Sequence, residues 1–577
     1  MIPRPEHPHP QCERAEWINL NGEWEFCLDS GVSGMARRLY EQEHLEGRIL
    51  VPFCPESRLS GVENRDFLNC VWYRRDVTVP EGWHGGRVLL HFGAVDHEAH
   101  IFLNGKEVGT HLGGYASFTV DLTGHIRAGV NSLCVCAIDD DRNPLFGHGK
   151  QSREYHSHRC YYTRVTGIWQ TVWLEHVPEV YIKSFRLFPD PENSALTLEA
   201  ELCGGGDLTA EAFYEGKSVG TLRLRSAHGG TVIGTMALSE LHLWEVGNGR
   251  LYDLSLTYGD DRVSSYFGMR SLALDGYRFL INGKSVFQRL VLDQGYYPDG
   301  VYTAPSEEAL IRDIRISQEA GFNGARLHQK VFEPRFLYHC DRMGYLVWGE
   351  YGNWGIDYSD ISALPAFLSE WREVLKRDFN HPSIVGWAPL NETWDYDGRK
   401  QDDRLLVSLY EQTKAYDPTR PCIDTSGAYH VKTDIYDLHD YIQSPEKFGQ
   451  IFALPTPEQI TGEFRNHHVK SVLHQGDYRH GQPFFVSEYG GIKWDVNSGL
   501  SEAWGYGDAP HSIEEFRERY RGLTDILLDN PCMFGFCYTQ LYDVEQETNG
   551  LYTYDRTPKC DVSFFREVNR RKAAIED

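Results

Sequence analysis

The stretch IVGWAPLNE, at residues 384–392, is an apolar run that ends in Asn391 and the carboxylate Glu392. A second stretch, FFVSEYGG at residues 484–491, places Glu488 at the end of another short apolar run. Buried parallel strands have this composition, and in a parallel barrel the residues just past each strand face one cleft. The two stretches therefore predict a barrel that brings Glu392 and Glu488 together, as the ends of its strands four and seven.

The chain around these stretches alternates short apolar strands with amphipathic helices over about 300 residues, the size of a complete barrel. The first helix is expected over 306–320, where a Ser-Glu-Glu sequence provides a cap. Further helices are expected over 333–343, 364–380, 404–416 and 513–528. This alternation predicts a catalytic (β/α)8 TIM barrel over residues 275–577.

Before residue 275 the chain has almost no helical periodicity. Apolar-alternating runs recur between turn signals over residues 1–180, and Asn104-Gly105 between two of them suits a type I′ hairpin turn. We expect a jelly-roll β-sandwich there. A fresh set of evenly spaced strands over 181–274 has the size of an immunoglobulin-like β-sandwich. The predicted fold is multidomain: two N-terminal sandwiches followed by the barrel.

Composition narrows the class of protein. The 577 residues carry a formal net charge of −26, which repels phosphate backbones and anionic membrane surfaces, so neither nucleic acid nor membrane is an expected partner. The aromatic share of 13% suits the stacking of rings on sugar faces, although most rings are expected to fill cores. A carbohydrate or glycoconjugate substrate fits these features best.

The 13 cysteines include no C-x-x-C pair, and reduced, mostly buried thiols explain an odd count of this kind. The N-terminal residues include no apolar stretch of the kind found in signal peptides, and no apolar run approaches the length of a membrane span. We therefore expect a cytoplasmic protein. His156-x-His158 is at most a fragment of a metal site, so neither a metal nor another cofactor is expected.

Paired carboxylates are the requirement of glycoside hydrolysis, in which one protonates the leaving oxygen and the other attacks the sugar or activates water. A single Glu after an apolar strand is often a surface residue or lies beside a helix cap. Two of them at barrel strand ends, one directly preceded by Asn391, favour a catalytic function. The amide of Asn391 has a role available, because it can donate a hydrogen bond to the sugar 2-hydroxyl.

Several motifs make the chain resemble family 2 of the glycoside hydrolases, the family of β-galactosidases, β-glucuronidases and β-mannosidases. They are WINLNGEW at 17–24, WYRR at 72–75, GIWQ at 167–170, VWLE at 172–175, Asn391-Glu392 and Ser487-Glu488-Tyr489-Gly490. The resemblance covers nearly the whole chain. It implies a sugar-binding-like first domain, Glu392 as the acid/base and Glu488 as the nucleophile of a retaining exo-glycosidase, and a possible homo-oligomer.

Other residues are expected to bind substrate. Asp293, His328 and His439 follow barrel strands one, two and six, and Trp394 and Trp494 lie in loops after strands, where they can stack on sugars. The resemblance adds Arg326 as the cation beside the nucleophile, Tyr489 within the nucleophile motif, and Tyr538 at the end of the last strand. The full expected set for substrate binding is Asp293, Arg326, His328, Asn391, Trp394, His439, Tyr489, Trp494 and Tyr538.

Departures from the family pattern leave the sugar open. The strand-one motif is replaced by LDQGYYPDG at 292–300, and the strand-two motif NGARLH at 323–328 has its His one place closer to the Arg. β-Glucuronidases of the family carry an Asn-x-Lys for the sugar carboxylate, whereas the best-placed segment here, Asn549-Gly550-Leu551, lacks the Lys.

The leading hypothesis is therefore a β-galactosidase-like enzyme. The alternatives are a furanosidase acting on galactofuranosides or arabinofuranosides, a β-glucuronidase, and a carbohydrate-binding protein with an inactive barrel.

Overall fold

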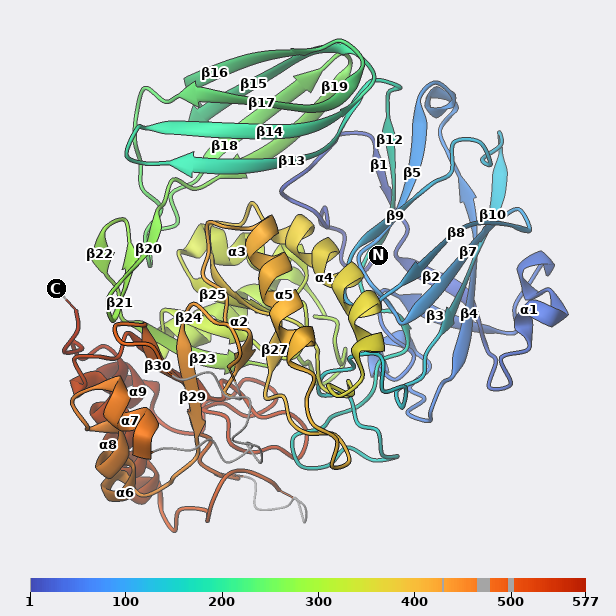
Figure 1. The fold of residues 1–577 in the computed structure, drawn as a ribbon. Coiled ribbons are helices and arrows are strands. Elements are labelled where there is room, and N and C mark those ends of the chain that lie inside the picture. The colour runs from blue at the N-terminus through green and yellow to red at the C-terminus, as the bar shows by residue number, and fades with distance from the viewer. Residues whose placement is uncertain (1, 428–429, 464–477, 497–502, 577) are drawn as a thin grey trace.

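A computed structural model describes residues 2–427, 430–463, 478–496 and 503–576. Within these residues the chain forms two β-sandwiches and a parallel barrel with helices around it (Figure 1). The first sandwich, blue and cyan in Figure 1, lies beside the barrel, and the second, green, lies across its upper edge. Both sandwiches therefore contact the barrel.

The first sandwich consists of a six-stranded sheet in the order β3-β2-β4-β10-β7-β8 and a four-stranded sheet in the order β1-β12-β5-β9. The described elements are β1 (Trp17–Asn19), β2 (Gly22–Leu28), α1 (Gly34–Arg37), β3 (Gly47–Val51), β4 (Cys70–Thr78), β5 (Arg87–Phe92), β6 (Val95–Asp96), β7 (Glu98–Leu103), β8 (Lys106–Leu112), β9 (Phe118–Asp121), β10 (Val130–Ile138), β11 (Gly167–Ile168) and β12 (Val172–Val177). Asn104 and Gly105 join β7 to β8 with φ angles of 52° and 78°, the positive values that a type I′ turn requires.

The second sandwich packs a three-stranded sheet, β13-β14-β17, against a four-stranded sheet, β16-β15-β18-β19. Its strands are β13 (Tyr181–Asp190), β14 (Ala195–Cys203), β15 (Gly206–Tyr214), β16 (Lys217–Ser226), β17 (Gly229–Ala237), β18 (Tyr252–Tyr258) and β19 (Asp261–Phe267). Alternate residues of β14 are buried, as the two-residue period of a strand with one face on a core predicts. A small sheet of β20 (Leu272–Asp275), β21 (Arg278–Ile281) and β22 (Lys284–Ser285) leads into the barrel.

Parallel strands of the barrel follow the order β26-β25-β24-β23-β31-β30-β29. They are β23 (Gln288–Asp293), β24 (Gly324–Leu327), β25 (Leu346–Glu350), β26 (Ile384–Ala388), β29 (Tyr436–Asp440), β30 (Phe484–Gly490) and β31 (Gly535–Thr539). The short pair β27 (Leu390–Asn391) and β28 (Thr425–Ser426), with a parallel bridge between Trp387 and Cys422, fills the place between β26 and β29. The predicted TIM barrel is confirmed, with Glu392 after its fourth strand and Glu488 in its seventh.

Helices surround these strands. They are α2 (Glu307–Glu319), α3 (Pro334–Met343), α4 (Leu364–Asp378), α5 (Asp403–Tyr416), α6 (Pro445–Phe452), α7 (Pro457–Glu463), α8 (Ile513–Asp529) and α9 (Val562–Asn569). The side chain of Ser306 accepts a hydrogen bond from the backbone N–H of Ala309, which is the cap expected for α2. The expected helices all exist, with bounds within a few residues of the prediction.

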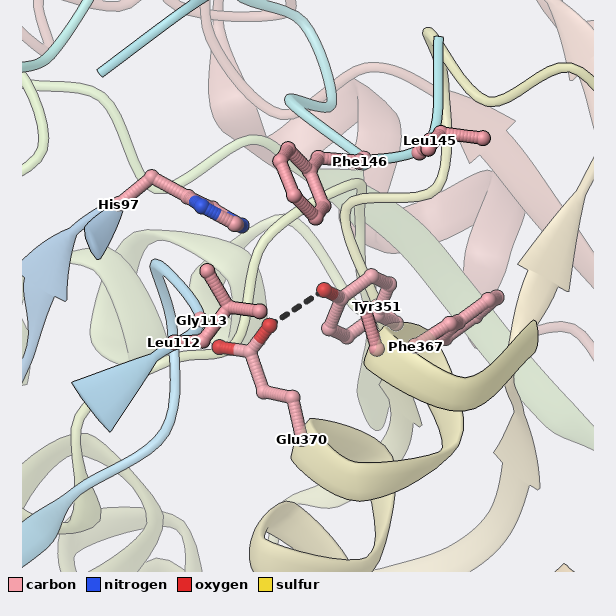
Figure 2. Close-up of a pocket in the computed structure, with 10 residues that line it drawn as sticks. His97, Leu112, Gly113, Leu145, Phe146, Tyr351, Phe367 and Glu370 are labelled. Atoms are coloured by element: carbon pink, nitrogen blue, oxygen red, sulfur yellow. Dashed lines mark hydrogen bonds between the residues drawn. The ribbon is translucent and has the colours of Figure 1, made fainter. Parts of the chain in front are cut away.

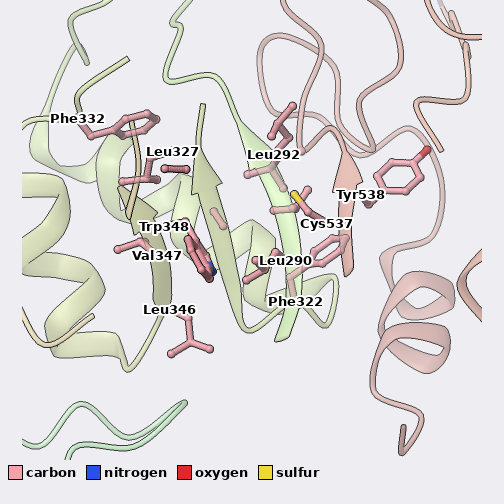
Figure 3. Packing of buried hydrophobic residues seen from close by; sticks show 14 of the residues in the cluster. Leu290, Leu292, Phe322, Leu327, Phe332, Leu346, Val347, Trp348, Cys537 and Tyr538 are labelled. Carbon is pink, nitrogen blue, oxygen red and sulfur yellow. The ribbon is translucent and has the colours of Figure 1, made fainter. Parts of the chain in front are cut away.

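The interior of the barrel is packed and not open. Trp348 of β25 fills its centre, and its indole N–H donates to Gln288 at 2.9 Å (Figure 3). A Cβ added to Gly386 would lie 2.3 Å from the Trp348 ring, so glycine is required opposite this side chain. Because Gln288 points inward and side chains alternate along a strand, Asp293 at the end of the same strand points outward.

The first sandwich is joined to the barrel by buried contacts. Glu370 of α4 accepts hydrogen bonds from the backbone N–H groups of Tyr115 and Ala116, at 2.6 and 2.9 Å, and from the hydroxyl of Tyr351. Figure 2 shows Glu370 and Tyr351 facing the sandwich residues His97 and Gly113 across a small hollow. A carboxylate that accepts three hydrogen bonds fixes the two units in one relative position.

Arg14 links the two sandwiches. Its guanidinium donates to Asp261 of β19 at 2.8 Å, to Glu175 of β12 at 3.0 Å, and to the carbonyl of Ile182 at 2.7 Å. Burial would raise the pKa of Glu175, but hydrogen bonding from His91 and the charge of Arg14 lower it to about 2.

The jelly-roll topology and the boundaries at residues 180 and 274 stay predictions. No helix among the described residues is long and apolar enough to cross a membrane.

We expect Arg14→Met to destabilise the protein by about 3–5 kcal/mol, because it leaves Glu175 and Asp261 buried without their cation. The pKa of Glu175 is lower in the folded state than its ordinary value of 4.5. Its charged form therefore contributes to folding stability above pH 4.5, and this contribution is lost as the pH falls toward 2. Urea unfolding at pH 7 and pH 3 measures both effects. Arg225→Met is the control, since Arg225 is highly exposed. Equal stability of the two variants at pH 7 would contradict this role.

Candidate active site

Arg326 of β24 lies at the centre of a buried polar cluster at the C-terminal end of the barrel. Its Nε donates to Glu350 at 2.6 Å and its Nη2 to the side-chain oxygen of Asn391 at 2.8 Å. Its Nη1 donates to Glu488 at 3.0 Å and to the carbonyl of Ser487 at 2.8 Å. Burial opposes the charge, yet Glu350 and Glu488 raise the pKa of Arg326, so the guanidinium stays ionised. One side chain thus connects barrel strands two, three, four and seven.

Glu488 lies in β30, where the strand register is irregular. The pairing with β29 shifts between Leu438 and His439, and the pairing with β31 shifts between Val486 and Tyr489. Bulges of this kind re-aim side chains beside active sites. Glu488 receives hydrogen bonds from Arg326 on one oxygen and from the hydroxyl of Tyr441 on the other. Both donors stabilise the ionised carboxylate.

Glu392 and Asn391 follow the fourth strand in a constrained backbone. Glu392 has a φ of 48°, in the left-handed region that non-glycine residues rarely adopt. The backbone of Asn391 is bonded to Asn353 through both its N–H and its C=O, each at 3.0 Å, and its side-chain oxygen accepts from Arg326. Its buried amide nitrogen has no hydrogen-bond partner among the described residues. Asn391 therefore presents a fixed, unused donor beside Glu392.

His439 connects the two carboxylates. Its Nδ1 lies 2.6 Å from Oε1 of Glu392, and its Nε2 lies 3.5 Å from Oε1 of Glu488. Burial lowers the pKa of His439, but the charge of Glu488 and the hydrogen bond to Glu392 outweigh it, and the net direction is upward. One oxygen of Glu392, one oxygen of Glu488 and one nitrogen of His439 lie within 4.8 Å of one another. The two carboxylates are therefore close enough to act on the same atom.

His328 lies on the other side of Arg326. Its Nδ1 is 3.1 Å from Glu350, which ends the third strand, and 3.9 Å from Glu488. Burial, which is the dominant effect, keeps the pKa of His328 well below its ordinary value. A neutral imidazole fits this place, because Arg326 already supplies positive charge to both glutamates.

Four residues of the expected set thus gather around Glu392 and Glu488: Arg326, His328, Asn391 and His439. Trp394 lies at the edge of the cluster, 5.8 Å from Trp354, whose indole N–H donates to the carbonyl of Asn391 at 3.1 Å.

Four expected residues lie elsewhere. Asp293 points outward and accepts from Tyr542 at 2.5 Å and from the backbone N–H of Gly295 at 2.9 Å. Tyr489 is fully buried and pairs with Thr524 of α8 at 2.8 Å. Tyr538 packs against Tyr520 of the same helix, on the outer side of β31 (Figure 3). Trp494 packs against Phe516, also of α8. Residues next to an inward-facing side chain point outward on a strand, which accounts for Tyr489 and Asp293.

Sequence reasoning missed Glu350, Tyr441 and Lys150. Glu350 ends a strand with the sequence LVWGE, the same pattern that pointed to Glu392 and Glu488. Tyr441 follows His439 by two residues, the spacing that puts side chains on the same side of an extended chain. Lys150 comes from the first sandwich, and no local pattern in the sequence connects it with the barrel.

Comparisons with known proteins agree with this arrangement. Residues 18–178 match the family model described as "Glycosyl hydrolases family 2, sugar binding domain", and residues 272–573 match the model described as "Glycosyl hydrolases family 2, TIM barrel domain". The barrel and its buried carboxylates therefore define a glycoside hydrolase that acts on O-glycosyl bonds. The chain belongs to glycoside hydrolase family 2, as its motifs indicated.

Similar proteins share the name beta-glucuronidase. One from Paenibacillus borealis is 23% identical and the match covers 95% of this chain and 96% of that protein. One from Canis lupus familiaris is 26% identical over 83% of this chain and 78% of its own length. A solved b-glucuronidase from Ruminococcus gnavus in complex with D-glucuronic acid superposes with a TM-score of 0.79 at 18% identity, covering 98% of this chain and 99% of that one. At this identity the structural likeness shows a shared fold.

Tyr441→Phe tests whether the cluster is organised for chemistry. The substitution removes one donor to the charged Glu488 and keeps the ring that stacks on Tyr506. We expect kcat to fall about 10- to 100-fold, the worth of one hydrogen bond to a charged group. Glycoside hydrolysis and thermal unfolding are the two measurements. Unchanged kcat would contradict the assignment, and Tyr40→Phe in the first sandwich is the control for a tyrosine hydroxyl outside the cluster.

Proposed function

We propose that this protein is a retaining exo-β-glycosidase, with Glu392 as the acid/base and Glu488 as the nucleophile. The observation that carries the proposal is the short separation of the carboxylates, whose nearest oxygens lie within 4.8 Å. Retaining glycosidases hold these groups about 5–5.5 Å apart, whereas inverting enzymes need about 6.5–9.5 Å to admit a water molecule. The separation therefore supports double displacement.

In the first step an oxygen of Glu488 attacks the anomeric carbon while the bond to the aglycone oxygen breaks. Glu392 delivers its proton to that departing oxygen. Arg326 and Tyr441 orient Glu488, because each of them donates a hydrogen bond to a different oxygen of the carboxylate. The unused amide N–H of Asn391 suits the sugar 2-hydroxyl, a contact that strengthens in the transition state.

In the second step a water molecule replaces the aglycone. Glu392, now a carboxylate, takes a proton from the water, whose oxygen attacks the anomeric carbon and breaks the ester bond to Glu488. Loss of the Glu488 charge on ester formation removes the repulsion that favours a protonated Glu392, so the same residue changes from acid to base. His439, which contacts both carboxylates, is placed to balance this change.

The default substrate is a neutral β-glycoside of the β-galactoside type, because the Asn-x-Lys of glucuronidases is missing at Asn549-Gly550-Leu551. A second candidate activity, β-glucuronidase, is favoured by the names of the similar proteins. A panel of 4-nitrophenyl glycosides that includes β-D-galactoside, β-D-glucuronide, and galacto- and arabinofuranosides separates these possibilities.

Replacement of each carboxylate gives a different kinetic result. Glu488→Gln should lower kcat on the order of 10⁴-fold or more for every substrate, as loss of a nucleophile does. Glu392→Gln should lower kcat about 10²- to 10⁴-fold for a 4-methylphenyl glycoside but much less for a 2,4-dinitrophenyl glycoside in the first step, because that leaving group needs no proton.

The matched control is Glu192→Gln in an exposed turn of the second sandwich, which should retain full activity. Proton NMR of the first product formed should show the β-anomer. An α-anomer as the first product, or hydrolysis that survives in Glu488→Gln, would refute the mechanism.

A further inference from the structure

Lys150 reaches the carboxylate cluster from the first sandwich. It lies in the long connection between β10 and β11 and is only 5% exposed, as buried as Glu392 at 5%. Its ammonium lies 4.0 Å above the ring of Trp354, the residue whose indole N–H is bonded to Asn391. No hydrogen bond or ion pair joins the Lys150 ammonium to any residue of the described part of the chain. A buried cation of this kind is available for a ligand.

The backbone around Lys150 is held rigidly against the barrel. The N–H of His148 donates to the carbonyl of Trp354 at 2.9 Å, and the N–H of Gly149 donates to the carbonyl of Gly352 at 3.2 Å. The carbonyl of Lys150 accepts from the N–H of Tyr162 at 2.7 Å. A Cβ on Gly149 would lie 2.2 Å from the carbonyl of Gln329. The loop therefore approaches the barrel as closely as a backbone can.

The residues that precede Lys150 in the loop are anchored as well. Leu145 and Phe146 of the same loop line a small hollow whose opposite side is formed by Tyr351 and the hydrogen-bonded Glu370 (Figure 2). Lys150 is thus fixed by contacts on both sides along the chain, and its position does not depend on a bond made by its own ammonium.

Glu547 lies in the loop after β31 and is connected to Lys150 through Tyr162. It is 1% exposed, and its carboxylate accepts hydrogen bonds from the Tyr162 hydroxyl and, at 2.9 Å, from the Asn549 amide. Tyr162 therefore holds Lys150 through its backbone and Glu547 through its hydroxyl. The two side chains influence each other electrostatically: burial lowers the pKa of Lys150, but Cys160, Glu547, Glu488 and Glu392 raise it, with a net rise.

A buried ammonium without a hydrogen-bond partner is costly to folding, and proteins retain such groups where function requires them. Each oxygen of Glu547 has further lone pairs to offer, because a carboxylate can accept about four hydrogen bonds. Lys150, which lies over the ring of Trp354 beside Asn391, thus supplies a donor, and Glu547, connected to it through Tyr162, supplies an acceptor.

We propose that Lys150 and Glu547 bind hydroxyl groups of the terminal sugar as donor and acceptor, and that they select a neutral glycone over the uronate of the same configuration. This inference rests on the proposed glycosidase function and names the substrate class of the same site. A hydroxyl group can both accept from Lys150 and donate to Glu547, whereas a uronate carboxylate can only accept.

The charges near the site favour the same selection. Glu488, which must be ionised to attack the sugar, and Glu547 both raise the pKa of the Lys150 ammonium by their negative charge. The Arg326 guanidinium is already occupied by Glu350, Glu488, Asn391 and the Ser487 carbonyl. A carboxylate on the substrate would bring a further negative charge into the site of the ionised Glu488 and would find each nitrogen of Arg326 already engaged in a hydrogen bond.

The test compares matched pairs of 4-nitrophenyl glycosides, β-D-galactoside with β-D-galacturonide and β-D-glucoside with β-D-glucuronide. The wild-type enzyme should hydrolyse the neutral member of its preferred pair at least 100-fold faster by kcat/KM. Lys150→Met should lower kcat/KM for that substrate at least 30-fold, while its melting temperature stays equal to that of the wild type or rises. If Lys150 had only a structural role, its replacement would lower activity only together with stability.

Two further variants keep the test decisive. Lys150→Gln retains a neutral donor on a side chain one atom shorter and should keep more activity than Lys150→Met, whatever the stability of the latter. Glu547→Gln removes one negative charge and should raise the uronide-to-neutral ratio of kcat/KM at least 10-fold. Lys217→Met, at an exposed position of the second sandwich, is the control and should behave as the wild type.

Preference of the wild type for the uronide, or wild-type activity in Lys150→Met and Lys150→Gln, would overturn this inference and leave the glycosidase mechanism intact. Failure of the wild type to hydrolyse any glycoside would overturn the proposed function and this inference with it.

Discussion

The guanidinium of Arg326 is the contact on which the site depends. It is 2% exposed and joins Glu350, Asn391 and Glu488, which come from three other strands of the barrel. Buried carboxylates without a cation would take up protons or disrupt the core. Arg326 supplies this cation and holds the carboxylates of Glu350 and Glu488 close together. The same contact occupies the side-chain oxygen of Asn391 and leaves its N–H₂ group available for a ligand. Arg326 therefore both supplies positive charge and orients a neighbouring side chain.

The barrel alone does not complete this site. The first sandwich is fixed on it by Glu370, which binds backbone N–H groups of Tyr115 and Ala116, and its loop carries Lys150 to the edge of the cluster. In our proposal the barrel strands supply the reacting carboxylates, and the sandwich supplies a cation that binds a hydroxyl group of the sugar. This division suits a family in which one catalytic arrangement serves different sugars, because loops vary more readily than strand ends.

The sequence allowed the barrel, the order of the domains and both strand-end glutamates to be predicted, because periodicity and strand-end position are local properties. It was less informative about which way individual side chains of a strand point. Asp293 and Tyr489 are one residue out of phase with inward-facing neighbours, so they point toward the helices. The bulge in β30 that turns Glu488 inward has no sequence signature. Lys150 could not be found at all, since its role arises from packing between segments far apart in the chain.

The central claim is that Glu488 forms a covalent bond to the sugar. A 2-deoxy-2-fluoro glycoside with a dinitrophenyl leaving group, made with the glycone that the enzyme hydrolyses fastest, slows both steps but leaves attack faster than hydrolysis. Mass spectrometry of the inactivated enzyme after proteolysis should find one added fluoroglycosyl group on the peptide that contains Glu488. A label on Glu392, or inactivation without any covalent label, would contradict the account.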